Sequence, residues 1–352
     1  MNPLRQRPGI FATICDALRD SLRERPLDCV QVEVTSHCSG RCTYCPHTTM
    51  SDVWNTAHMD EAVFAALRPL LRQCKRAHLQ GWGEPMLHPR FLDMVAFARS
   101  AGCAVSSTTC GLHMDEERAA RIVASGMDVL AFSLVGTDTH SNNARAGIPF
   151  DNTCRAITCL REEQRRTGAT LPDIHLAYLL LPDRMDAVKT LPEVMERLDV
   201  PVAVVSTLDF LAHPDHAALA FAPDEQDKIS RARALLEDVR QRAEDAGRTV
   251  VFALPSPHEI PVEGGCREQV ASTLFVGVDG GIAPCVYRHL PLDPDSGPQA
   301  SPNGDLCFGR LPDANPLDIW NSAPYSAFRH ALTDGQPDSI CARCPKRHEE
   351  VG

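Results

Sequence analysis

The segment VQVEVTSHCSGRCTYC, residues 30–45, decides the fold. Val30, Val32 and Val34 alternate with polar residues, which is typical of a β-strand that buries one face. The strand runs directly into a loop with three cysteines in C-x3-C-x2-C spacing. The segment therefore predicts a first strand whose carboxyl end carries a cysteine-rich loop.

Five more strand and helix units follow this first one. Short apolar runs predict strands over residues 77–80, 104–109, 128–134, 174–181 and 201–207. Amphipathic patterns predict helices over residues 60–71, 89–101, 115–125, 151–166 and 187–198. Six successive βα units imply an α/β fold with a parallel sheet and right-handed crossovers. Because a full barrel has eight units, we expect a partial (β/α)6 barrel with its chemistry at the carboxyl ends of the strands.

The pattern changes after residue 255. A long helix over 223–246 and a further strand over 250–254 complete the alternating region. Beyond them Gly, Pro, Asp and Cys dominate until a helical pattern returns over 315–332, and residues 291–304 are typical of an exposed loop.

A domain boundary is therefore predicted near residues 255–264. It separates the βα region from a small cysteine-containing region. The expected organisation is an N-terminal extension, a catalytic core and a C-terminal domain, over residues 1–27, 28–255 and 256–352.

Composition narrows the classes of partner and compartment. The net charge of −11 would repel a nucleic-acid backbone, and no apolar run reaches the roughly 18 residues that a membrane span needs. No signal-peptide pattern is found, so we expect a cytoplasmic protein that binds neither nucleic acid nor membrane. The 15 cysteines are odd in number and partly clustered, which favours metal or cluster ligation over disulfides.

The first cysteine set is Cys38, Cys42 and Cys45. Three thiolates cannot close a tetrahedral zinc site without a fourth ligand from elsewhere. They can hold three irons of a [4Fe–4S] cluster and leave the fourth iron open to another ligand. Gly40 gives the loop the backbone freedom to fold around such a cluster.

This loop, placed directly after the first strand and with Tyr44 before its last cysteine, resembles the signature of the radical S-adenosylmethionine (radical SAM) superfamily. The resemblance implies that the open iron chelates the amino and carboxylate groups of S-adenosylmethionine. It also implies that an electron from the cluster cleaves this cofactor to a 5′-deoxyadenosyl radical, which abstracts a hydrogen from the substrate. The cofactors then supply the difficult chemistry, and the protein positions them.

Other residues extend the resemblance. Gly81, Gly83 and Glu84 follow the second strand and are similar to the superfamily's GGE motif, whose backbone carbonyls, often with the glutamate, approach the methionyl ammonium. Tyr44 matches an aromatic residue that lies near the adenine. Ser133, at the end of the fourth strand, stands where the superfamily often has a ribose-contacting polar residue.

Cys266, Cys285, Cys341 and Cys344 form the second set. This region resembles the auxiliary-cluster domain called SPASM, or its shorter form, twitch. Because no cysteine follows Cys344, where the full SPASM pattern has several, the resemblance implies one auxiliary [4Fe–4S] cluster that the protein ligates fully. A zinc site closed by the same four cysteines is the alternative, and Cys307 is the substitute if one of the four is not a ligand.

Three further residues are candidates for the substrate or cofactor site. Cys110 ends the third strand, where its thiol would serve as a hydrogen-atom donor to a substrate radical or as a small buried residue. His140 and Arg145 follow the fourth strand, where they would bind the methionyl end of the cofactor or the substrate, or form a solvated surface pair.

The leading hypothesis is a radical SAM oxidoreductase or epimerase. Its expected substrate is a polar small molecule, sugar-like or aminocyclitol-like, because the 27 residues before the core are too short for the leader-binding domain of many peptide-modifying members. The alternative is a peptide- or protein-modifying maturase. An alternative from another functional class is a non-catalytic iron–sulfur or zinc-binding electron-transfer protein. The resemblance also implies a reductant such as flavodoxin or ferredoxin.

Overall fold

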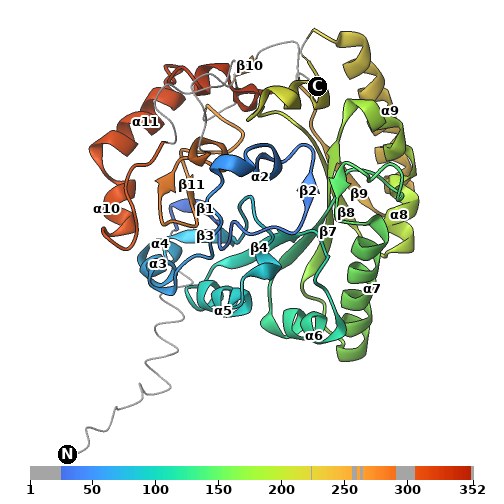
Figure 1. Cartoon of the computed structure of the whole chain (residues 1–352), viewed down its shortest axis with the longest axis horizontal. Helices are drawn as coiled ribbons and strands as arrows, with labels where there is room; N and C mark the ends of the chain where they lie inside the picture. The colour runs from blue at the N-terminus through green and yellow to red at the C-terminus, as the bar shows by residue number, and fades with distance from the viewer. Residues whose placement is uncertain (1–24, 223, 256–259, 262–264, 291–305, 350–352) are drawn as a thin grey trace, which may run out of the picture.

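The computed structural model describes residues 25–222, 224–255, 260–261, 265–290 and 306–349 (Figure 1). Most of the predicted N-terminal extension, the predicted loop over 291–304 and most of the predicted boundary region near 255–264 lie outside the described residues.

A nine-stranded sheet forms the centre of the molecule, in the order β12-β11-β1-β3-β4-β5-β7-β8-β9. Its six predicted strands are β1 (Leu27–Val32), β3 (Cys74–His78), β4 (Ala104–Thr109), β5 (Val129–Leu134), β7 (Asp173–Leu180) and β8 (Val202–Thr207). All neighbouring pairs among these six are parallel. The predicted α/β class with a parallel sheet is therefore confirmed.

Three more strands extend the sheet at its two edges. β9 (Thr249–Phe252) adds to β8 in parallel. At the other edge β11 (Thr273–Val276) pairs in parallel with β1, and β12 (Ile282–Ala283) returns antiparallel to β11. The C-terminal hairpin thus continues the sheet of the βα region, so hydrogen bonds run across the predicted domain boundary. The division of the chain into domains stays a prediction.

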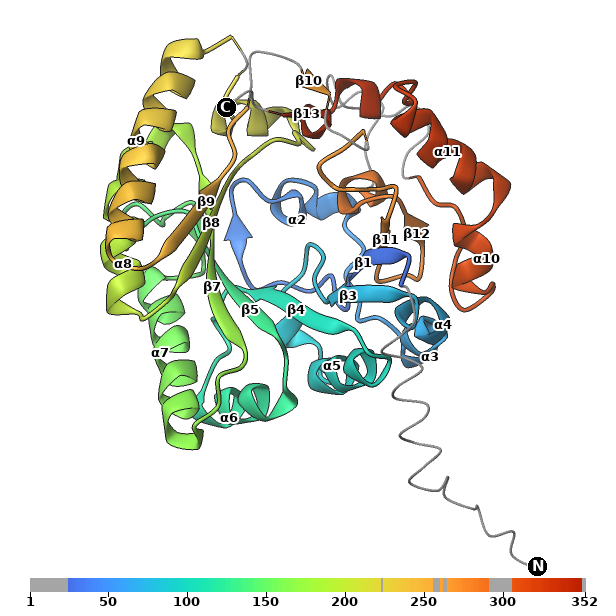
Figure 2. The same cartoon turned by 180° about the vertical axis from the view of Figure 1, so that it is seen from behind.

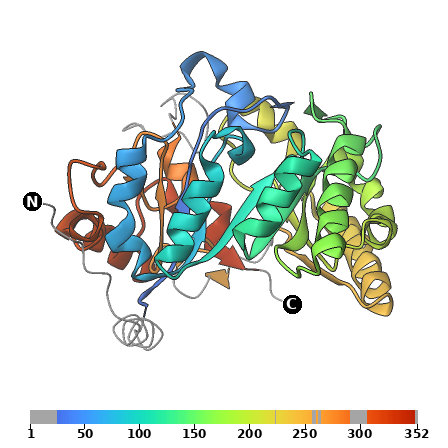
Figure 3. The ribbon, with the colours of Figure 1, turned by 90° about the horizontal axis from the view of Figure 1, so that it is seen from below.

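Helices cover the outer face of the curved sheet (Figures 1 and 2). They are α5 (Phe91–Ser100), α6 (Glu116–Ser125), α7 (Phe150–Thr167), α8 (Leu191–Arg197) and α9 (Gln226–Asp245). Asp115 accepts a hydrogen bond from the Arg118 amide and caps the start of α6, and Gly126, at φ +69°, ends it. Seen from below, several of these helices stand next to one another, and the blue segment that includes α2 (Pro46–Thr49) lies beyond one end of them (Figure 3).

Three predicted helices are interrupted. The helix expected over 60–71 divides into α3 (Glu61–Ala66) and α4 (Arg68–Leu71), with a proline in the first turn of α4. The one expected over 315–332 divides into α10 (Pro316–Trp320) and α11 (Ala323–Thr333), because Ser322 caps a new helix start. In place of the helix over 187–198, a 3₁₀ segment, η3 (Pro182–Thr190), precedes α8.

Successive side chains along each strand lie on opposite faces of the sheet. On β5, Leu130, Phe132 and Leu134 are buried in the hydrophobic core, while Ser133 lies on the opposite, inner face. Since β9 and β12 are opposite edges of the sheet, the barrel is open rather than closed. Within the described ranges, no helix has the length and apolar character that would let it cross a bilayer.

Candidate cofactor and substrate site

The cysteine loop is held at the carboxyl end of β1 by backbone pairing. Its short strand β2 (Arg41–Cys42) pairs antiparallel with β6 (Arg145–Ala146), which places Cys42 opposite Arg145. The Cys45 amide donates to the Cys42 carbonyl over 3.1 Å, and Cys45 precedes the first residue of α2. The Gly40 amide lies 3.4 Å from the Cys38 sulfur. The loop is therefore tied to β6 at its central cysteine and folded on itself around the other two.

One cavity of about 420 Å³ opens at this end of the sheet. Its lining includes every residue predicted to hold the first cluster or its cofactor, namely Cys38, Cys42, Tyr44, Cys45, Gly81, Gly83, Glu84 and Ser133, together with the predicted hydrogen-atom donor, Cys110. These residues come from the cysteine loop and from the ends of β3, β4 and β5. The structure thus brings together residues that are up to 95 positions apart in sequence, from Cys38 to Ser133.

Glu84 is buried and fixes the glycine-containing turn against β4. One carboxylate oxygen accepts hydrogen bonds from the Thr109 hydroxyl (2.7 Å) and the Met86 amide (3.1 Å), and the other accepts from the Cys110 amide (2.7 Å). The Glu84 amide in turn donates to the His37 carbonyl over 2.8 Å. The turn and the segment that leads into the cysteine loop are consequently one hydrogen-bonded unit.

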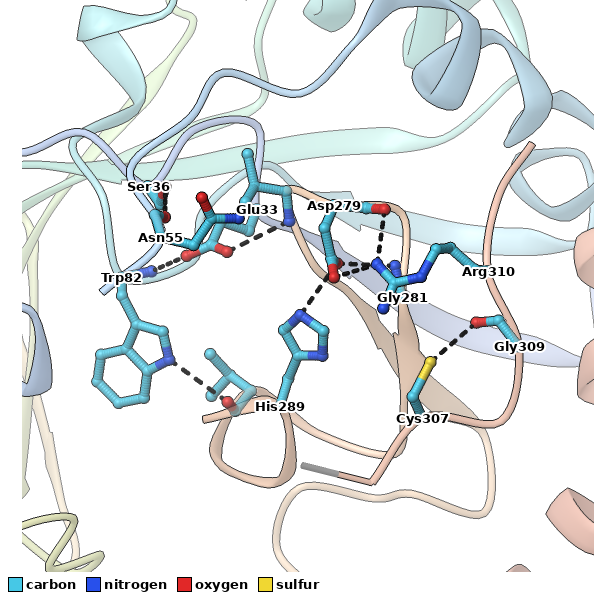
Figure 4. A network of polar contacts seen from close by, with 12 residues as sticks. Glu33, Ser36, Asn55, Trp82, Asp279, Gly281, His289, Cys307, Gly309 and Arg310 are labelled. Carbon is cyan, nitrogen blue, oxygen red and sulfur yellow. Dashed lines mark hydrogen bonds and ion pairs between the residues drawn. The ribbon is translucent and has the colours of Figure 1, made fainter. Parts of the chain in front are cut away.

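Glu33 is a buried residue that sequence reasoning missed. Its carboxylate accepts from the Trp82 amide, in the glycine-containing turn, over 2.9 Å and from the Val278 amide, beyond β11, over 3.3 Å (Figure 4). Burial raises the pKa of Glu33, while the hydrogen bonds from Trp82 and Val278 oppose this shift. Glu33 directly follows β1, and its place just after a barrel strand was the available sequence signal.

We predict that Glu33→Ala destabilises the protein and weakens cofactor binding. The substitution leaves the Trp82 and Val278 amides without their acceptor, and an unsatisfied buried donor costs about 1–3 kcal/mol. Chemical denaturation should show a lower free energy of unfolding, and titration with S-adenosylmethionine a weaker affinity. The control is Asp28→Ala, in β1, whose 2.7 Å pair with Lys75 is at the surface. Equal effects of the two substitutions would contradict this role for Glu33.

The structure separates His140 from Arg145. His140 is exposed, whereas Arg145 is buried and lines the cavity, so a solvated surface pair is wrong for Arg145. Its Nη1 donates to the Ser133 carbonyl, and its buried Nε has no partner among the described residues. A buried guanidinium with a donor to spare fits an anionic group such as the carboxylate of S-adenosylmethionine.

Cys110 is buried on the side of the cavity that faces the cysteine loop. It packs in a small cluster with Cys42 and Ile148, and its sulfur lies 3.5 Å from the Leu112 amide. Burial raises the pKa of this thiol, and the neighbouring Glu84 carboxylate raises it further. Cys110 is therefore a protonated thiol in the cavity wall, which is compatible with both roles considered for it.

The four cysteines of the second set line another, smaller cavity. Cys266 precedes β11, and Cys285 directly precedes the 3₁₀ turn η5 (Val286–His289). Cys341 begins the turn η6 (Cys341–Arg343), and Cys344 follows it. Cys307 does not line this cavity; it is exposed, and its thiol donates to the Gly309 carbonyl over 3.2 Å (Figure 4). The geometry therefore favours the original four cysteines over a substitution by Cys307.

Burial favours the protonated form of the thiols at both cavities. Burial raises the pKa of Cys38 to about 11, of Cys45 to about 12 and of Cys266 to about 11. Cluster binding must therefore displace protons from these thiols. Among the described residues, no group of three Cys, His, Asp or Glu side chains could hold a single metal ion. In a [4Fe–4S] cluster each iron that the protein ligates takes its own thiolate, which matches cysteines that surround a cavity.

The two cavities share a wall made by Phe210, Tyr287 and Lys346. The rings of Phe210 and Tyr287 lie 4.9 Å apart, and the Lys346 ammonium lies 5.3 Å from the Tyr287 ring centre. The Asp209 carboxylate, two residues beyond β8, forms ion pairs with Arg267 at 3.2 Å and with Lys346 at 3.7 Å. Its place just after a barrel strand was a usable sequence signal, whereas Lys346 reaches the wall only through tertiary structure.

Two family models match the chain. Residues 32–182 match the model described as the radical SAM superfamily, and residues 266–345 match SPASM, described as an iron–sulfur cluster-binding domain. The first match covers the cysteine loop and the glycine-containing turn, and the second covers all four cysteines of the smaller cavity. The predicted family and the predicted cofactors, namely S-adenosylmethionine with a [4Fe–4S] cluster and an auxiliary cluster, are thereby confirmed.

Similar proteins span most of the chain. One is the tungsten-containing aldehyde ferredoxin oxidoreductase cofactor-modifying protein of Pyrococcus furiosus, 24% identical over 90% of this chain and 86% of that protein. Another is the PqqA peptide cyclase of Streptomyces rochei, also 24% identical, over 91% of this chain and 82% of the relative.

Solved structures share the fold. The protein anSMEcpe, with S-adenosylmethionine bound, has a TM-score of 0.64 at 15% identity, over 88% of this chain and 81% of that one. Streptococcus suis SuiB has a TM-score of 0.65 at 13% identity, over 91% of this chain and 71% of its own. SuiB has also been solved with its precursor peptide SuiA, with a TM-score of 0.63 at 11% identity, over 100% and 83% of the two chains.

Proposed function

Because the chain is a radical SAM protein with a C-terminal SPASM domain, we propose that it is an enzyme that modifies a carbon of a peptide or protein substrate. The similarity to a peptide cyclase over 91% of the chain carries this choice of substrate class. The fold shared with SuiB, which binds a precursor peptide, agrees with it. The peptide alternative thus replaces the small polar molecule as the leading hypothesis.

The described residues have distinct tasks in this proposal. Cys38, Cys42 and Cys45 hold the cluster that, with S-adenosylmethionine, supplies the radical for hydrogen abstraction. The buried Arg145 guanidinium pairs with the carboxylate of that cofactor, and the turn clamped by Glu84 presents backbone carbonyls to its ammonium group. The wall of Phe210, Tyr287 and Lys346 separates this site from the four-cysteine cavity.

A peptide labelled with deuterium at carbon tests the substrate class. Reduced enzyme, kept anaerobic, is given S-adenosylmethionine and peptides encoded beside its own gene. We expect a changed peptide mass together with 5′-deoxyadenosine that carries deuterium, because the hydrogen is abstracted from the peptide. Unchanged peptides would refute the proposal. The second candidate, a small molecule or cofactor, has support in the cofactor-modifying relative; deuterium transfer from such a compound instead would establish it.

Cys110 is proposed as the hydrogen-atom donor, if the net reaction is an epimerisation. The thiol S–H bond breaks, the substrate radical gains the hydrogen atom, and the thiyl radical then takes an electron and a proton with the external reductant as electron source. We predict that Cys110→Ala still forms 5′-deoxyadenosine but loses the epimerised product, and Cys110→Ser, of similar size, behaves likewise. If either variant, assayed in heavy water, forms epimerised product that carries deuterium from the solvent, then Cys110 is not the hydrogen-atom donor and only packs the cavity wall.

A further inference from the structure

Arg288 is a buried cation in the wall of the four-cysteine cavity. It lies in η5, three residues after Cys285, and only 6% of its surface is exposed. Its amide donates to the Cys285 carbonyl over 3.2 Å, so the turn that presents Cys285 also sets the position of Arg288. The guanidinium therefore shares one small cavity with all four thiols.

Most of the donors of this guanidinium have no acceptor among the residues that the structure describes. Nη2 donates to Asp338 over 3.1 Å, but Nε and Nη1 are buried without an acceptor among the described residues. A buried N–H that finds no acceptor costs about 1–3 kcal/mol, and more in a charged group. Buried donors without an acceptor in a native fold call for an explanation, such as a bound ion or cofactor. The cavity that Arg288 lines is the place where that partner would lie.

The neighbouring charges leave Arg288 more available than Lys346. The Lys346 ammonium meets two carboxylates, Glu268 at 2.9 Å and Asp209 at 3.7 Å. Arg288 has an ion pair only with Asp338 among the described residues, and that carboxylate also accepts from the Ile340 and Cys341 amides, each at 2.9 Å. The Arg288–Asp338 pair therefore joins the Cys285 turn to the Cys341 turn and still leaves donors on Arg288.

We propose that Arg288 donates hydrogen bonds to the sulfurs of the auxiliary cluster and raises its reduction potential; this rests on the proposed four-cysteine ligand set. Reduction adds one negative charge to the cluster. A buried cation and N–H donors stabilise that added charge, and both are known determinants of cluster potential. Arg288 is thus a positioning residue that tunes the cluster without ligating it.

A redox titration of the full-length protein with both clusters, followed by EPR, tests this role. A variant with Cys38, Cys42 and Cys45 changed to Ala identifies the auxiliary signal. We expect Arg288→Gln to bind the same amount of iron with a more negative midpoint potential, and Arg288→Lys, which keeps the charge, to shift less. Arg329→Gln is the control, because Arg329 stacks on Trp320 at 3.7 Å and does not line the cavity.

The variant Asp338→Asn distinguishes an effect of Arg288 on the cluster potential from a role in holding the two turns that carry the cysteine ligands. It breaks the same ion pair but removes a negative charge, so we expect its midpoint potential to move in the positive direction. Shifts of the same sign in Asp338→Asn and Arg288→Gln would overturn the proposal, because a loosened tie would then explain both. An unchanged potential in Arg288→Gln at full iron content would also overturn it. If the unaltered protein lacks the auxiliary EPR signal, the four-cysteine ligand set itself is refuted. The iron assay distinguishes this outcome from a failure of the role proposed for Arg288.

Discussion

Cys42→Ala is expected to reduce the formation of 5′-deoxyadenosine to background. Cys42 is buried, pairs through its backbone with Arg145 and lines the cavity with Cys38 and Cys45. Loss of this thiolate leaves two ligands from the loop, too few for a cluster that must keep one iron open. Anaerobic iron analysis should fall from roughly eight to about four irons per chain, and the EPR change on adding S-adenosylmethionine should disappear.

Two matched cysteine variants make this result specific. Cys159→Ala changes a partly buried residue of α7 that lines neither cavity, and should keep both the iron content and the cleavage rate. Cys285→Ala should lose about four irons, those of the auxiliary cluster, and should keep the EPR response to S-adenosylmethionine. Cleavage at the normal rate by Cys42→Ala would refute the assignment of the first cluster.

Gly83→Ala is expected to lower the rate of cofactor cleavage by about 100-fold, the order of loss that a 1 Å misplacement causes. An added Cβ would lie 2.1 Å from the Thr35 carbonyl oxygen and 2.8 Å from that of His37. Both are backbone atoms of the segment that enters the cysteine loop, so neither can rotate away. The turn and the loop must therefore move apart, and the affinity for S-adenosylmethionine, measured by titration, should fall as well.

The control for this substitution is Gly168→Ala. Gly168 ends α7 at φ +72°, and an added Cβ would meet no atom within 4 Å. We expect a stability loss of about 1–2 kcal/mol from the left-handed backbone and unchanged cofactor affinity. If folded Gly83→Ala, with full iron content, cleaved the cofactor at the normal rate, the close packing of this turn would have no catalytic importance.

The residues predicted to contact the cofactor line one cavity because each lies at or after the end of a strand. Tyr44, Glu84 and Ser133 lie in different βα units, yet parallel strands bring their carboxyl ends to one edge, and all three line one cavity. Their individual contacts with cofactor stay predictions. The substrate class was the weaker inference, since a short N-terminal extension is indirect evidence, and the relatives favour the peptide alternative.

Local pattern was sufficient to predict the six strands of the barrel, because alternation is a property of neighbouring residues. Tertiary structure alone decided three other features. It joined β11 to β1, it buried Arg145 while leaving His140 exposed, and it made Lys346 part of a wall between two cavities. Each depends on contacts between segments far apart in the chain, and such contacts leave no periodic signal in either segment.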